Sequence, residues 1–205
     1  LAQYGPETVA GFGVASRAES LTLVLFYALS AIIGPFVGQN ISANRPDRIY
    51  RALWMCTVFC IGSGLVMAGG LAIVREWLPG LFSESAEVIG VAAAFLLIVP
   101  ISYGAYGMVM VMNASFNGMG KPMPAVHISV GRMVVIYVPL AMWLDRLFPV
   151  WGIFAAYTIA NIVTGIVAYA WARASVQGQC DMHAMPISPP AEAGQAGAAV
   201  STRDR

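Results

Sequence analysis

Long stretches without any charged residue restrict the folding of this chain more than any other feature. No Asp, Glu, Lys or Arg occurs within residues 52–74, 88–120 or 147–172. Each stretch can hold the roughly 20 residues with which an α-helix crosses a bilayer. The whole chain is 59% hydrophobic and 10% charged, whereas soluble domains carry about 25% charged residues. These features predict an integral membrane protein.

Five apolar segments predict an all-α fold, a polytopic bundle of about five transmembrane helices. Lipid offers no hydrogen-bond partners to unpaired backbone N–H and C=O groups, so each segment is expected to be helical. Pro35, Pro100 and Pro139 lie inside segments and are expected to kink them. The third segment is longer than a straight crossing, so we expect it to tilt, to protrude into water or to break near Pro100. The segments are residues 11–37, 52–74, 88–116, 124–143 and 150–171.

Basic residues between the segments predict the orientation, because Lys and Arg favour the cytoplasmic side. The loop of residues 38–51 holds three arginines and is expected inside, and alternation then places Lys121 and Arg173 inside as well. Residues 1–173 would form the bundle, in the inner (plasma) membrane of the cell. Residues 174–205 lose the apolar pattern and are expected to be a disordered cytoplasmic tail. The first residues would lie outside without a signal peptide, which predicts that earlier transmembrane segments precede this sequence.

The composition and the motifs exclude several classes of function. A net charge of +1 without a basic tract offers nucleic acid no binding surface. No nucleophile elbow, phosphate loop or zinc spacing occurs, so we expect no enzyme activity, no catalytic residue, no metal and no cofactor. Cys56 and Cys60 share a helical face without a His, Asp or Glu beside them, which favours packing over metal or redox chemistry. His127 and His183 also lack ligand neighbours.

Polar residues inside the apolar segments are the candidates for function, because lipid makes them costly. A charge at a helix centre costs about 2.5–3.5 kcal/mol, so Arg17 and Glu19 are the sharpest candidates, and a position near the membrane interface is their alternative explanation. Two residues apart, they point to different helical faces. We expect Glu19 to be a site for a coupling cation or proton. The candidates for the substrate cavity are Arg17, Tyr27, Tyr103, Tyr106, Asn113, Asn117 and Asn161.

Two other interpretations concern polar side chains of the third and fourth segments. Asn113 and Asn117 are four residues apart and share a face; hydrogen bonds between helices are the alternative to substrate contact for them. Arg132 lies near the basic end of the fourth segment. We expect its side chain to extend to the lipid headgroups, with a role in gating as the alternative.

Two stretches of this sequence resemble MATE transporters, the multidrug and toxic compound extrusion family. PFVGQNISANRPDRIYRAL, residues 35–53, resembles the end of a helix and the cytoplasmic loop that follows it in that family. NGMGKPMPA, residues 117–125, resembles the turn between its tenth and eleventh helices. The likeness covers residues 5–173. Ser42 and Asn44 depart from it, because the family often has glycines there.

The resemblance implies a transporter of about twelve helices in two six-helix lobes, which exports organic cations in exchange for sodium or protons. This chain would supply the eighth to twelfth helices. Its partners would be the bilayer, the missing N-terminal lobe and small organic cations. Some members bind the coupling cation with an aspartate of the tenth helix, but residues 103–106 contain no acid. Coupling here would use Glu19 or lie in the missing lobe. A lipid or oligosaccharide flippase of the wider superfamily and a non-transporting membrane scaffold subunit remain the alternatives.

Overall fold

Five long helices make up the bundle, as predicted. The computed structural model describes residues 2–184, and within them it contains helices and turns but no strand. The five helices that are long and apolar enough to cross a membrane are Pro6–Ser42 (α1), Pro46–Val74 (α2), Ala86–Gly118, Pro122–Leu147 and Trp151–Gly178. Two short helical pieces, Ala2–Tyr4 (η1) and Trp77–Gly80 (α3), lie outside these spans.

Two of the spans change their helical geometry along their length. The third consists of α4 (Ala86–Ile98), a 3₁₀ turn η2 (Val99–Ser102) and α5 (Tyr103–Gly118). The fourth consists of α6 (Pro122–Val130), a π-helical segment η3 (Gly131–Tyr137) and α7 (Val138–Leu147). Of the three alternatives for the third segment, the structure shows the break near Pro100. Pro139 follows the π-helical segment, whereas α1 stays α-helical through Pro35.

Prolines and left-handed residues mark where the helices begin and end. Pro46 and Pro122 stand in the first turns of α2 and α6. Backbone N–H groups in a first turn have no hydrogen-bond partner within the helix, so the helix loses no hydrogen bond when proline stands there. Just before those helices, Asn44 and Gly120 have φ values of 49° and 70°. Asparagine tolerates this left-handed conformation better than most residues, which explains how Asn44 can occupy a position where glycine was expected.

The last helix, α8, extends further than the sequence analysis predicted. It runs from Trp151 to Ala184, so residues 174–184, which were expected to be disordered, are helical. The physical reason is that residues 174–184 contain no proline and are mostly compatible with a helix, so the helix continues after the membrane-compatible pattern ends. The rest of the predicted tail lies outside the described residues.

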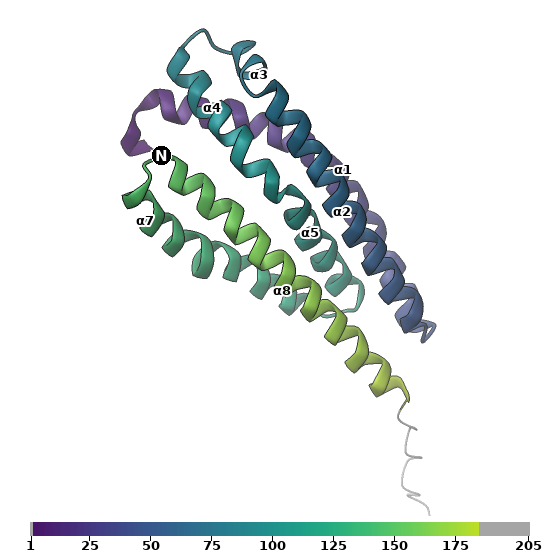
Figure 1. Cartoon of the computed structure of the whole chain (residues 1–205). Coiled ribbons are helices and arrows are strands. Elements are labelled where there is room, and N and C mark those ends of the chain that lie inside the picture. The colour runs from purple at the N-terminus through teal and green to yellow at the C-terminus, as the bar shows by residue number, and fades with distance from the viewer. Residues whose placement is uncertain (1, 185–205) are drawn as a thin grey trace, which may run out of the picture.

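The span formed by α4, η2 and α5 lies at the centre of the bundle and packs against α1, α2 and α8 (Figure 1). Glycines allow the backbones of neighbouring helices to come close to this span. A Cβ atom added to Gly104 would lie 2.8 Å from the carbonyl oxygen of Cys60 and 2.9 Å from Cα of Ile61. A Cβ atom added to Gly64 of α2 would in turn collide with the backbone of Gly104. Small residues let helix backbones approach in membranes, where van der Waals packing stabilises the bundle.

The outer faces of the bundle are apolar. Leu65, Val66 and Ile73 of α2 are 61%, 77% and 85% exposed, and Val135 and Met142 of the fourth span are 70% and 62% exposed. Such a surface suits lipid tails, because the tails are as apolar as these side chains and their contact exposes no apolar group to water. The chain is thus built to lie in a bilayer.

One end of the bundle is closed by contacts of the first described residues. The hydroxyl of Tyr4 and the side-chain amide of Gln3 donate hydrogen bonds to Asp145, at 2.8 and 2.9 Å. Asp145 also accepts the N–H of Val150 at 3.4 Å, which ties the turn between α7 and α8 to the start of the chain (Figure 1). The hydrogen bond to Asp145 raises the pKa of Tyr4, because the tyrosine must keep its proton to donate it.

Candidate functional site

A pocket between α1, α4, η3 and α8 is the candidate functional site. Its volume is about 210 Å³. Since α1 makes no extensive contact with α6, η3 or α7, the pocket occupies space that helix packing leaves free. Most of its wall is aromatic or aliphatic, and Glu19 is the one charged residue in it; the lining residues are Phe12, Glu19, Phe95, Met133, Tyr137, Ile153, Phe154 and Tyr157.

Aromatic rings build one wall of this pocket. Phe95 of α4 contacts Phe12 of α1 edge to face, with ring centroids 5.6 Å apart, and Phe154 of α8 in the same way at 5.3 Å. Tyr137 and Tyr157 form a third pair of this kind at 5.8 Å. Edge-to-face pairs stabilise the packing beyond the area that they bury. The wall is therefore a firm surface against which a flat apolar ligand could lie.

Glu19 carries the chemistry of the pocket. Its side chain is half-buried, and its Oε1 atom has no hydrogen-bond partner in the described part of the chain. The hydroxyl of Tyr157 and the charge of Arg132 both act electrostatically on the carboxyl group. A carboxylate with an unused acceptor atom in an apolar pocket can take up a proton or a cation. Such a group is a functional candidate, because burying its charge is costly.

Arg132 belongs to the interior of the bundle, and the expectation that it reaches the lipid headgroups is wrong. Its guanidinium donates a hydrogen bond of 2.8 Å to Oδ1 of Asn161 and lies 4.6 Å from the ring centroid of Tyr106. Asn161 is fully buried, and its amide donates to Oγ of Ser102 at 3.0 Å. These partners stabilise the charge inside the protein, which removes the need to extend to the interface.

The π-helical segment η3 supplies both Arg132 and part of the pocket wall. Met133 and Tyr137, four residues apart, line the pocket, and Arg132 precedes them. Pro139 lies two residues beyond the segment and has no N–H for the helical ladder. Departures from α-helical geometry inside a helix are frequent at functional sites. The segment thus places a cationic and an aromatic side chain next to Glu19 and Tyr157.

The structure brings some of the sequence-derived candidates together around this pocket. Glu19, Tyr106 and Asn161 are linked through Arg132 and Tyr157. Tyr103 is completely buried near Glu19, and its hydroxyl has no partner among residues 2–184. These side chains come from α1, α5, η3 and α8, which lie far apart in the sequence.

Other candidates lie elsewhere. Asn113 donates to Oγ of Ser129 at 3.2 Å, further along the interface between α5 and α6, whereas Asn117 is exposed near the end of α5. Tyr27 is 55% exposed on α1. Arg17 is exposed and lines a different pocket, which agrees with the expectation that it and Glu19 point to different faces of α1.

Sequence reasoning missed the role of Arg132, Tyr137 and Ser102 in this arrangement. Arg132 stands inside an apolar segment, and that position was a signal that it needs a partner. Ser102 carried no comparable signal, because a serine hydroxyl in an apolar helix can bond to its own backbone, and Tyr137 carried none because its ring is compatible with an apolar surrounding. Within the described residues, no group of His, Cys, Asp and Glu has the arrangement of a metal site.

Comparison with known proteins gives the family. A model of the MatE family matches residues 1–143. A FAD transporter of Shewanella oneidensis is 31% identical over 173 residues, which are 84% of this chain and 38% of that protein. The multidrug export protein MepA of Staphylococcus haemolyticus is 23% identical over 172 residues, which are 82% of this chain and 37% of that protein.

The fold agrees with this assignment. The crystal structure of the MATE transporter VcmN from Vibrio cholerae in its bent form matches with a TM-score of 0.82 and 28% identity. The match covers 87% of this chain and 42% of VcmN. The protein is therefore a polytopic membrane protein with the fold of this part of a MATE transporter. The chain belongs to the MATE family, and it spans about two fifths of the length of the relatives that it matches.

Proposed function

We propose that this chain is most of the C-terminal lobe of a secondary active transporter, and that the whole transporter exports organic cations or drugs in exchange for sodium ions or protons. The single observation that carries the proposal is Glu19, a half-buried carboxylate with an unpartnered oxygen that faces an aromatic pocket. An acidic group attracts a small cation, and the aromatic wall suits a planar organic molecule. Two relatives are named as a probable multidrug resistance protein and a multidrug export protein, and these names support the same role.

Competition between two cations for one carboxylate would produce the exchange. When a sodium ion or proton neutralises Glu19, the attraction of the pocket for an organic cation falls, and the substrate leaves. Arg132 stays held by Asn161 and Tyr106, so its positive charge near Glu19 limits how tightly any cation binds. Transporters of this kind work by rocking one bundle against another around a midplane site, so the N-terminal lobe is the expected partner.

A phosphate-bearing substrate is a second candidate, because of Arg132 and one relative. The relative from Shewanella oneidensis is named as a FAD transporter, and FAD contains a diphosphate group as well as flat aromatic rings. Arginine is well suited to phosphate, since its fork of donors can make paired hydrogen bonds. Arg132 has no ion-pair partner in the described part of the chain.

Transport by the full-length protein that contains this chain tests both substrate classes. The protein would be reconstituted into liposomes, and accumulation of ethidium or of FAD would be measured under an imposed sodium or proton gradient. We expect one of the two gradients to drive accumulation, and an ionophore that collapses it to abolish the signal. Equal accumulation with and without each gradient would contradict the proposed exchange mechanism.

The proposed orientation places the loop of residues 38–51 and the C-terminus in the cytoplasm of a cell with this protein in its plasma membrane. In a variant without native cysteines, we expect Glu84→Cys to react with an impermeant maleimide on intact cells. Arg45→Cys should react only after the membrane is permeabilised, because basic loops stay inside. Labelling of position 45 from outside would overturn the orientation.

A further inference from the structure

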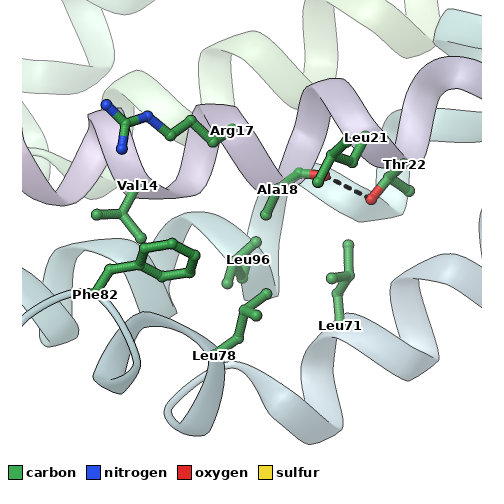
Figure 2. A pocket seen from close by; sticks show the side chains of 9 residues that line it. All are labelled: Val14, Arg17, Ala18, Leu21, Thr22, Leu71, Leu78, Phe82 and Leu96. Carbon is green, nitrogen blue, oxygen red and sulfur yellow. Dashed lines mark hydrogen bonds between the residues drawn. The ribbon is translucent and has the colours of Figure 1, made fainter.

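A second pocket lies on the opposite side of α1 from Glu19, and it combines one charge with an apolar wall. Its volume is about 230 Å³. Figure 2 shows Arg17 stretched along α1 at one side of the pocket, with apolar side chains gathered at the other. These side chains come from α1, α4 and the region of α2 and α3, and they include Ala18, Leu71, Leu78, Phe82 and Leu96.

The wall of this pocket offers no polar group to a ligand apart from Arg17. Thr22 is the other polar residue that lines it, and its hydroxyl already donates a hydrogen bond of 2.8 Å to the carbonyl oxygen of Ala18 (Figure 2). Phe82 is 60% exposed, so the pocket lies at the surface of the bundle. It is therefore open to molecules that surround the protein in the membrane.

Arg17 itself lacks a protein partner. No hydrogen bond, ion pair or ring contact to its guanidinium is present within residues 2–184. The guanidinium has five donors, and their natural partner is a phosphate or carboxylate group. An apolar pocket beside an unpaired guanidinium is complementary to an amphiphile whose charged end is anionic.

The depth of Arg17 identifies which amphiphile fits. Leu71 lies in the last turn of α2, and Leu78 lies beyond the end of that helix, in α3. Both residues line the pocket together with Arg17, so the pocket lies where α2 leaves the membrane. Arg17 then lies at the level of the lipid headgroups. Trp77 of α3, 66% exposed at this end of the bundle, suits the same interface.

We propose that this pocket binds an anionic phospholipid, with the phosphate on Arg17 and an acyl chain against Leu71, Leu78 and Leu96. Lipid is the one amphiphile that is always present at this depth, and its phosphate provides the charge that Arg17 lacks. The bound lipid would stabilise the contact between α1 and the α2–α3 region. The proposal is independent of the transport function, because Glu19 and its pocket lie on another face of α1.

Native mass spectrometry of the purified full-length protein that contains this chain, in mild detergent with phosphatidylglycerol added, tests this proposal. We expect the wild-type protein to retain phosphatidylglycerol. Arg17→Gln should weaken this binding at least about fivefold, as expected for one basic residue near an anionic headgroup. The matched control is Arg146→Gln, which removes an exposed arginine from the last turn of α7 and should leave binding unchanged. Equal binding by the two variants, or no lipid on the wild-type protein, would overturn the proposal.

A second variant and a competitor separate a lipid from a free anion. Ala18→Phe narrows the apolar pocket while Arg17 stays in place, and we expect it also to weaken phosphatidylglycerol binding at least about fivefold, since the acyl chain loses its space. This variant decides the matter if Arg17→Gln does not fold. Inorganic phosphate at the same concentration should not displace the lipid. Displacement by phosphate, or full binding by Ala18→Phe, would show that Arg17 takes an anion without a lipid tail.

Discussion

Glu19→Gln is expected to lower gradient-driven transport by the full-length protein about tenfold or more, while expression and folding stay normal. The exchange keeps the volume of the side chain, but it removes the charge and replaces one acceptor oxygen by an amide donor. Two opposite unit charges 4 Å apart attract by about 4 kcal/mol near a protein surface, and a loss of about 1.4 kcal/mol already reduces occupancy tenfold. The measurement is sodium- or proton-driven accumulation of ethidium in proteoliposomes, together with the thermal unfolding temperature.

Two further variants make this prediction specific. Glu87→Gln removes an exposed carboxylate from the first turn of α4 and should transport like the wild-type protein. Glu19→Asp keeps the charge on a shorter side chain and should retain part of the coupling. If Glu19→Gln transports with unchanged dependence on the gradient, Glu19 is structural, and the coupling site lies outside this chain.

Gly64→Ala is expected to destabilise the bundle strongly, with a sharp fall in the yield of folded protein. The added methyl group would collide with the backbone of Gly104, where no flexible side chain can move aside. Overpacking of this kind costs about 1–3 kcal/mol or more, which is a large share of the stability of a domain. The measurement is the thermal unfolding temperature of the purified chain in detergent, followed by size-exclusion chromatography.

Gly62→Ala is the matched control for this effect. It makes the same substitution two residues earlier in α2, where a Cβ atom would meet nothing within 4 Å. Alanine favours the helix over glycine by about 0.5–1 kcal/mol, so this variant should be as stable as the wild-type chain or slightly more stable. Equal destabilisation by both variants would mean that helix flexibility, and not the close contact of α2 with α5, explains the loss.

Much of the fold was predictable because the membrane imposes simple rules. Charge-free stretches longer than a bilayer crossing can only be helices in lipid, and all five spans were found. The break near Pro100 was also predictable, since proline removes a helical hydrogen bond. The π-helical segment was not, because residues 131–137 contain no proline or other signal that distinguishes π- from α-helical geometry.

The candidate site was predictable only in part. Glu19 was singled out because a carboxylate in an apolar segment is costly, and this argument needs no neighbour. The pairing of Arg132 with Asn161 joins residues 29 positions apart in the sequence, and nothing in either segment indicates the other. Arg17 looked equivalent to Glu19 in the sequence, yet the two line different pockets.

The sequence by itself determined that this chain crosses a membrane five times, where each crossing lies, and that Glu19 is an isolated acid within them. Only the tertiary structure decided which side chains meet Glu19, that Arg132 is held inside the bundle, and that Arg17 faces an apolar pocket. The reason is physical. In a soluble helix, an apolar stripe marks the buried face, but a membrane helix is apolar all round, because lipid and protein interior are alike in polarity. Helix neighbours are then set by small residues and close packing, and these act only once the helices have come together.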